Sequence, residues 1–188
     1  LNTLAGIYIG ANQPKEAENY ILKGIELSKK ADNPARMAVL LGMASEVYHA
    51  LGNDAEALRY IDEACQVEKS LKREDKLMVR LAQKASVLIG MHQYQEAERI
   101  LSEVIPSLRE MKNRHSLGIA CNKMGMTLLS QEREKEAIPY YREAADIFVA
   151  MGDIHNEMHS RRGLYESLWH HRPDSAKLEL DRFNELKD

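Results

Sequence analysis

The dipeptide Glu-Ala occurs four times in this chain at a constant interval of forty residues, beginning at Glu16, Glu56, Glu96 and Glu136. Other positions keep the same interval. Twelve residues before each of these alanines is another small residue: Ala5, Ser45, Ala85 and Gly125. Four residues after each alanine is a bulky residue: Ile21, Ile61, Leu101 and Tyr141. Such a repeat constrains the fold more than any local pattern, because each copy forms the same structural unit.

Each copy is predicted to form two helices joined by a short turn. The apolar residues are separated by three, four and seven positions, which places them on one face of a helix. Four short segments are predicted to be the turns: GANQP (10–14), LGND (51–54), GMHQ (90–93) and SQER (130–133). One such helical hairpin cannot bury its apolar face alone, so neighbouring hairpins are expected to stack on one another.

The composition agrees with a helical protein and excludes several functional classes. Glycine (10) and proline (5) are few among 188 residues, which argues against a loop-rich β fold. The net charge of −3, without a basic cluster, argues against binding of nucleic acid by this segment. No apolar run is long enough to cross a bilayer. Cys65 and Cys121 lack a Cys-x-x-Cys motif and are interpreted as buried free thiols.

The repeats resemble those of the tetratricopeptide repeat family, whose signature combines a small residue after an apolar one with a later Tyr and Ala. The second copy reads Leu41, Ala44-Ser45, Tyr48, Ala57, Ile61, and the fourth reads Cys121, Met124-Gly125, Leu128, Ala137, Tyr141. The resemblance covers residues 1–152. It implies an all-α fold, a right-handed α-solenoid of about five helix-turn-helix repeats and about ten antiparallel helices.

We expect one solenoid domain over residues 1–188, and the chain, which starts at Leu1, is interpreted as a fragment of a longer protein. The last repeat is atypical, because its alanine, Ala176, falls one residue short of the forty-residue interval. The repeats are expected at about 1–33, 34–73, 74–113, 114–152 and 153–188.

Two features depart from the family pattern. The repeat has forty residues rather than about 34, and the closing proline is replaced by Lys29, Lys69, Arg109 and Val149. We therefore expect the second helix of each repeat to continue nearly two turns further. Pro34 and Pro173 suit the first turn of a helix, whereas Pro106 and Pro139 are expected inside helices.

No constellation of residues indicates catalysis, and the chain is interpreted as a non-enzyme without metal or cofactor. Neither a phosphate-binding loop nor a nucleophile elbow is present. His155 and His159 are four residues apart with Glu157 between them, but Asn156 stands where a zinc protease has Glu. We interpret them as an exposed helix face and keep a metal-dependent enzyme as a minor alternative. Carboxylates such as Glu68 are interpreted as solvated.

The family resemblance implies that the first helix of each repeat lines a concave groove that binds a peptide or a partner helix. By their position in the repeat, the predicted partner-binding residues are Asn2, Met43, Glu46, His49, Gln83, Ser86, Asn122, Lys123, Met126 and Arg161. The family's Lys/Asn clamp for chaperone tails is missing at the matching positions. The resulting groove mixes apolar, amide and charged groups, which suits an amphipathic helix or an extended peptide.

The favoured hypothesis is a non-catalytic protein-interaction module within a larger bacterial regulatory or signalling protein. Its lengthened repeats resemble those of such regulators. The alternative is a self-association scaffold, a homodimer formed through the atypical last repeat around Trp169 and Phe183. The identity of the partner and the compartment stay open. A soluble segment on either the cytoplasmic or the periplasmic side of a membrane-anchored regulator fits the sequence.

Overall fold

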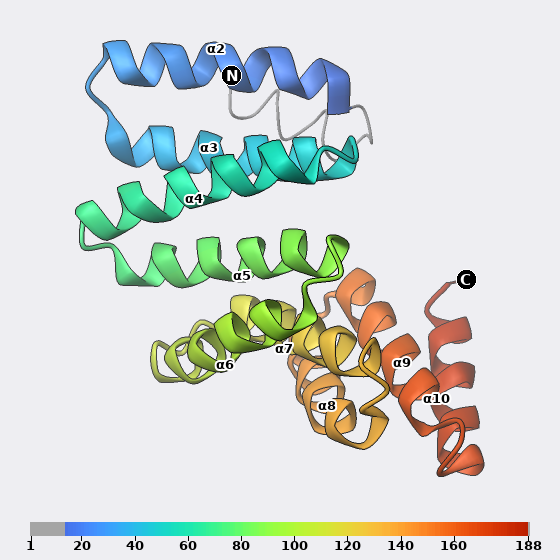
Figure 1. Ribbon diagram of the computed structural model, residues 1–188. Helices are drawn as coiled ribbons and strands as arrows, with labels where there is room; N and C mark the ends of the chain where they lie inside the picture. Colours follow the sequence, from blue (N-terminus) through green and yellow to red (C-terminus); the bar gives the residue numbers. More distant parts are fainter. Residues whose placement is uncertain (1–13, 188) are drawn as a thin grey trace. The chain divides into compact units, whose positions relative to one another are not determined.

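The computed structural model describes residues 14–187, and all regular secondary structure in this range is helical (Figure 1). The helices are α2 (Pro14–Lys30), α3 (Pro34–Ala50), α4 (Asp54–Ser70), α5 (Glu74–Gly90), α6 (Tyr94–Glu110), α7 (Arg114–Leu129), α8 (Glu134–Met151), α9 (Ile154–Leu168) and α10 (Pro173–Glu185). The all-α prediction is confirmed. The predicted site residue Asn2 lies outside the described residues. Across residues 14–187, no helix is long and apolar enough to cross a membrane.

The helices are spaced by twenty residues, half of the sequence repeat. From α2 to α9 each helix begins twenty residues after the one before it, and α2 to α6 each contain 17 residues. Short turns join α2 to α9, and each of these seven turns has one residue with positive φ: Asp32, Gly52, Lys72, His92, Lys112, Glu132 and Gly152. The last helix, α10, begins at Pro173, one residue early, in agreement with the shifted position of Ala176.

The expected extension of the second helices is wrong. Helices α2, α4 and α6 end at Lys30, Ser70 and Glu110, one residue beyond the positions where the family proline is missing. A left-handed residue ends each of them, because positive φ cannot continue a right-handed helix. A left-handed backbone turn therefore ends each of these helices, at the place where the family pattern has a proline.

The chain divides into two compact units, residues 1–93 and 94–188. In the first unit, α2, α3 and α4 pack together around a core that includes Ile21, Leu41 and Ile61. In the second unit, α6 packs on α7, α7 on α8, α8 on α9 and α9 on α10. Its wholly buried side chains include Leu101 and Phe148.

The repeated alanines are the close-contact points that the sequence pattern predicts. The alanines of the four Glu-Ala pairs, Ala17, Ala57, Ala97 and Ala137, are all 0% exposed. Interiors are packed as densely as organic crystals, so a larger side chain at these points would separate the helices. The recurrence of alanine follows from this spacing.

Candidate interaction surface

In the first unit, the predicted residues Glu46 and Gln83 meet across helices α3 and α5. The Gln83 amide donates a hydrogen bond from Nε2 to Glu46 Oε1 at 2.5 Å. Its oxygen accepts one from Arg80 Nη1 at 2.7 Å, which fixes the orientation of the amide. Glu46 is exposed, whereas Met43 is half-buried on α3 and packs against the core of this unit. The structure thus brings Glu46 and Gln83 together.

A buried ion cluster supports these contacts, and sequence reasoning missed it. Glu68 on α4 is 0% exposed, which contradicts its interpretation as a solvated carboxylate. Its oxygens lie 3.2 Å from Arg73 Nε and 3.7 Å from Arg80 Nε. These contacts are ion pairs by distance but lack hydrogen-bond geometry. A Cβ on Gly42 would stand 2.5 Å from Arg80 Nη1, so the glycine makes room for the guanidinium.

Desolvation and Glu68 act on Arg80 in opposite directions. Burial lowers the pKa of the Arg80 guanidinium, and the carboxylates of Glu68 and Glu46 oppose this effect. A buried charge is tolerated only when it is paired. We interpret the Glu68 and Arg80 pair as the element that holds Gln83, and through it Glu46, in place.

The remaining predicted residues of the first unit, His49 and Ser86, contact neighbouring side-chain or backbone groups. His49 Nδ1 lies 2.6 Å from Asp54 Oδ1. The His49 ring packs on the backbone of Gly90, where a Cβ would overlap it. The Ser86 hydroxyl donates to the Ala82 carbonyl oxygen at 3.3 Å.

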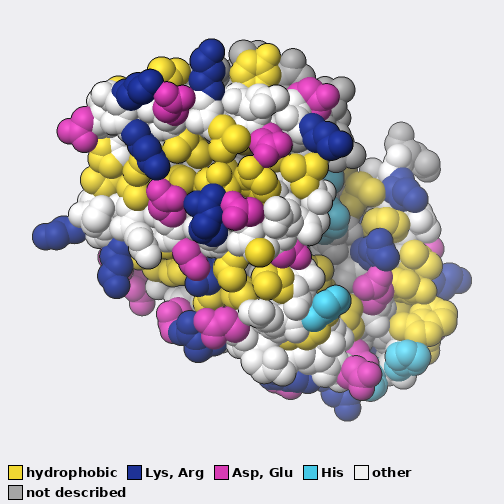
Figure 2. All heavy atoms as spheres, turned by 45° about the horizontal axis from the view of Figure 1, so that its top comes forward, with side chains coloured by type: hydrophobic (Ala, Val, Ile, Leu, Met, Phe, Trp, Pro, Cys, Tyr) yellow, Lys and Arg dark blue, Asp and Glu magenta, His cyan; other side chains and the backbone are white. Residues whose placement is uncertain are grey.

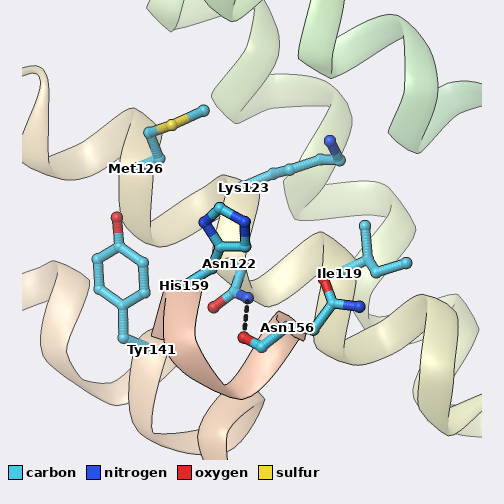
Figure 3. A pocket seen from close by; sticks show the side chains of 7 residues that line it. All are labelled: Ile119, Asn122, Lys123, Met126, Tyr141, Asn156 and His159. Atoms are coloured by element: carbon cyan, nitrogen blue, oxygen red, sulfur yellow. Dashed lines mark hydrogen bonds between the residues drawn. The ribbon is translucent and has the colours of Figure 1, made fainter. Parts of the chain in front are cut away.

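In the second unit, a pocket of about 330 Å³ lies on the face of α7 that the sequence predicts to bind a partner (Figure 3). It contains three of the predicted residues, Asn122, Lys123 and Met126. Sequence reasoning missed its other lining residues, which are Ile119, Tyr141, Asn156 and His159. The volume is at the lower end for ligand pockets and suits one or two side chains of a partner.

Asn122 connects α7 to α9 at the edge of the pocket. Its Nδ2 donates to the Asn156 carbonyl oxygen at 3.4 Å, as Figure 3 shows, and its Oδ1 accepts from Ser160 Oγ at 2.8 Å. These bonds occupy part of the amide's hydrogen-bonding capacity. Asn122 therefore positions the two helices as well as lining the pocket.

Tyr141, from α8, lies beneath the pocket between two glycines. A Cβ on either Gly125 of α7 or Gly163 of α9 would come within 3.0 Å of its ring. The residue is 5% exposed, and burial raises the pKa of its phenol. Its hydroxyl borders the pocket (Figure 3), and no side chain or carbonyl of the described residues accepts a hydrogen bond from it.

The lining of the pocket includes basic side chains, and the nearby acidic residue Glu166, which acts on Tyr141, pairs with Arg162 at 2.8 Å. No acidic residue is among its lining residues. Burial lowers the pKa of His159, and the positive charges of His155, Arg162 and Lys123 lower it further. The pocket is therefore a better environment for an anion than for a cation.

Glu157 does not join the two histidines in a metal site. The rings of His155 and His159 contact each other, with centroids 4.8 Å apart. Glu157 is 4% exposed, and its Oε1 lies 3.3 Å from Arg161 Nε and 3.4 Å from Arg182 Nε. Within residues 14–187, no group of three or more His, Cys, Asp or Glu side chains could hold a metal. The Glu157 carboxylate, on which the metal hypothesis depended, instead forms ion pairs with Arg161 and Arg182.

The predicted residue Arg161 belongs to this second ion cluster. Its Nη1 donates to Glu179 Oε2 at 2.8 Å, which links α9 to α10. It is absent from the lining of the pocket formed by Asn122, Lys123 and Met126.

Helices of 13 to 18 residues that begin at nearly constant intervals, with a pocket formed by α7, α8 and α9, define a helical repeat protein. Residues 119–148, which include most of the pocket, match the family model of the tetratricopeptide repeat. The match covers one repeat, and together with the TPR-like repeats of the solved structures below it confirms the sequence-based resemblance to this family. No curated protein matches the chain.

Solved structures share the fold over nearly the whole chain. A protein of Podosopora anserina assigned as a kinesin light chain, with nearly identical TPR-like repeats, aligns with a TM-score of 0.74 and 15% identity, over 99% of this chain and 92% of its own. BtubC (BKLC) from P. vanneervenii aligns with a TM-score of 0.81 and 14% identity, over 98% of this chain and 77% of its own. At such identities the likeness shows the fold alone.

A third similar structure belongs to a much larger protein. It is the STAND signal transduction ATPase PH0952 of Pyrococcus horikoshii, which has a tetratricopeptide repeat sensor. The TM-score is 0.79 at 14% identity, and the alignment covers 96% of this chain but 28% of that one. Proteins of this fold are generally non-catalytic scaffolds that bind other proteins.

Proposed function

We propose that this chain is a non-catalytic interaction module that binds a peptide or a partner helix along the first helices of its repeats. The observation that carries the proposal is the pocket on α7 and α9, which contains Asn122, Lys123 and Met126. These residues were selected from the sequence, by the groove positions that the family resemblance implies. Met126 is 43% exposed, and a large exposed apolar side chain beside a pocket is typical of a binding surface.

We also propose that the module is part of a larger regulatory or signalling protein, as its lengthened repeats indicate. The P. horikoshii protein supports this, because it is a signal transduction ATPase with a tetratricopeptide repeat sensor. The compartment and the bacterial origin stay predictions.

Self-association through the last repeat is the second candidate. Trp169, the C-cap of α9, is 52% exposed and Leu178 of α10 is 70% exposed, so large apolar side chains of the last repeat face solvent. Light scattering at several concentrations tests this candidate. A mass that rises with concentration in the wild type, and stays monomeric in Trp169→Ser, would favour it over a monomeric module.

Selection of peptides from a random-sequence library, with the whole chain as bait, tests the proposed function. The dissociation constants of selected peptides are then measured by fluorescence anisotropy for wild type and for Met126→Glu. We expect Met126→Glu to weaken binding about tenfold or more, because a charge replaces an apolar contact at the pocket.

Met151→Glu is the matched control. Met151 is 47% exposed and lies outside the pocket, so the same substitution changes net charge and surface hydrophobicity equally. It should leave binding unchanged. A library that yields no binder, or binders that tolerate Met126→Glu as well as Met151→Glu, would contradict the proposal.

A further inference from the structure

The Tyr141 hydroxyl is the accessible end of an otherwise buried side chain, and it borders a pocket. Tyr141 is 95% buried, since 5% of it is exposed, and the described residues supply no acceptor for its O–H. Because the hydroxyl oxygen is accessible at the pocket, a bound ligand can replace water as the acceptor of its O–H. The orientation in Figure 3 leaves a ligand in the pocket as the natural acceptor.

The ring position is rigid, which makes this donor a fixed feature of the pocket. Gly125 and Gly163 flank the ring on α7 and α9, where no larger residue would fit. The other three copies of the repeat have Ile21, Ile61 and Leu101 at the position of Tyr141. The fourth copy therefore combines a larger residue that has a hydroxyl with glycine at the facing small position.

The surroundings select a negatively charged acceptor. Lys123 and His159 line the same pocket, and the charged groups that act on His159 (His155, Arg162 and Lys123) are all basic. Glu166 is the acidic group that acts on Tyr141, and it pairs with Arg162 outside the pocket lining. An anionic group close to them gains both charge attraction and a hydrogen bond from the phenol. Ile119 and Met126 supply an apolar wall for the methylene groups that lead to such an anion.

We propose that this pocket receives an aspartate or glutamate side chain of a bound peptide, and that the Tyr141 hydroxyl donates a hydrogen bond to its carboxylate. The proposal rests on the proposed peptide-binding function and names the chemistry of its partner. Tyr141 is then the residue that determines specificity at this position, although it comes from a second helix and not from the first helices that the repeat pattern indicates.

The test is a double-mutant cycle between the chain and a selected peptide. Peptides selected by the whole chain from the random-sequence library are aligned, and the Asp or Glu that they share is replaced by Asn or Gln. Each peptide is measured against wild type and Tyr141→Phe, which removes the hydroxyl and keeps the ring between the two glycines. We expect Tyr141→Phe to weaken binding of the acidic peptide about tenfold or more, and binding of the amide peptide much less.

Tyr140→Phe is the matched control, because Tyr140 is the neighbouring tyrosine of α8 and does not line the pocket. It should bind both peptides as the wild type does. Unfolding in urea verifies that both variants stay folded at the assay temperature.

The outcomes separate this inference from the function on which it rests. Selected peptides without a shared acidic residue, or equal losses from Tyr141→Phe with both peptides, overturn the inference and leave the interaction module intact. Selected peptides that are insensitive to Met126→Glu overturn the proposed function and this inference together.

Discussion

At the scale of single residues, the fourth repeat shows how two substitutions compensate for each other. Tyr141 is larger than the isoleucine or leucine of the other copies, and Gly125 is smaller than their alanine or serine. Gly163, on the next helix, completes the space for the ring. The combination of a larger residue at position 141 with glycine at position 125 was visible in the sequence. The orientation of the hydroxyl toward a pocket was not, because periodicity indicates which face of a helix is buried and not which atoms lie next to it.

Gly163→Ala is expected to destabilise the protein, although alanine is the better helix former. The gain in helix propensity is at most about 1 kcal/mol. The added methyl group collides with the Tyr141 ring, and overpacking of this kind costs about 1–3 kcal/mol. Urea unfolding should therefore show a lower free energy of unfolding for Gly163→Ala.

The Tyr141→Leu background identifies the cause of this loss. If the ring is the obstacle, adding Gly163→Ala to Tyr141→Leu should cost less than adding it to the wild type. Equal costs in the two backgrounds would mean that the ring does not limit the space at Gly163.

At the scale of helices and turns, one turn geometry explains the twenty-residue spacing. In the turn after α6, Asn113 N–H donates to the Leu108 carbonyl at 3.1 Å, and Lys112 N–H donates to that of Arg109 at 3.1 Å. This is the Schellman pattern, which ends a helix through one left-handed residue. The Asn113 side chain then accepts from Ser116 N–H at 3.3 Å and begins the next helix. One residue thus closes one helix and caps the following one.

Five of the seven left-handed turn positions are occupied by residues other than glycine, which is a source of strain. We expect Lys112→Gly to raise the free energy of unfolding by about 1 kcal/mol, because glycine adopts positive φ without a steric penalty. Gly152→Ala should lower it by a similar amount. Thermal unfolding monitored by circular dichroism measures both changes.

Lys112→Ala separates backbone strain from loss of the side chain. Alanine removes the lysine side chain and keeps a Cβ in the left-handed conformation, so no stabilisation is expected. A gain equal to that of Lys112→Gly would assign the effect to the charge of Lys112 instead.

The N-cap residue of α9 is Asp153, which has a titrating carboxyl group, whereas the N-cap residues of α3 and α7 are the neutral Asn33 and Asn113. Asp153 accepts from the Asn156 backbone N–H at 3.1 Å and from Asn156 Nδ2 at 2.8 Å, and His115 Nε2 lies 3.3 Å away. The hydrogen bonds from Asn156 and the proximity of His115 lower the pKa of Asp153. The ionised cap is therefore favoured in the folded state.

Asp153→Ala is expected to lower the free energy of unfolding by about 1–2 kcal/mol at neutral pH. Because the folded pKa lies below the unfolded value, the contribution of the ionised carboxylate is complete above about pH 4 and is lost as the pH falls through the folded pKa. The difference between wild type and Asp153→Ala, measured by urea unfolding, should thus narrow in acid.

Asp153→Asn is the control for this pH dependence. It keeps a side-chain acceptor for the cap and removes the titrating group. Its difference from Asp153→Ala should not change across the same pH range. A wild-type advantage over Asp153→Ala that persists unchanged in acid would contradict the assignment.

At the scale of the whole molecule, the sequence was most informative where the repeats agree. The period predicted the helix pairs and the buried alanines, and the family resemblance selected Asn122, Lys123 and Met126 on α7, which line a pocket. The period did not predict contacts that occur in one copy of the repeat and not in the others. Glu68 carries no local sign that it is buried, because its partners Arg73 and Arg80 belong to the next helix and its turn. Likewise, nothing in the period indicates that Arg161 pairs with Glu179 of α10.

The two cysteines provide one probe for each compact unit, since Cys65 belongs to the first and Cys121 to the second. Burial raises the pKa of Cys65 to about 11. Burial and the carboxylate of Glu143 raise the pKa of Cys121. The thiolate is the reactive species, so both thiols should resist modification in the folded chain.

We expect Cys65, in a Cys121→Ala variant, to react with a thiol reagent near pH 8 about 100-fold more slowly than a free cysteine, because its thiolate fraction is smaller by about that factor. Cys121, in a Cys65→Ala variant, should react more slowly still, since it is 0% exposed whereas Cys65 is partly exposed. Absorbance of the released reagent group measures both rates, and the same variants in denaturant should react as free thiols do. A folded variant that reacts at the free-thiol rate would show that the unit containing that cysteine opens readily.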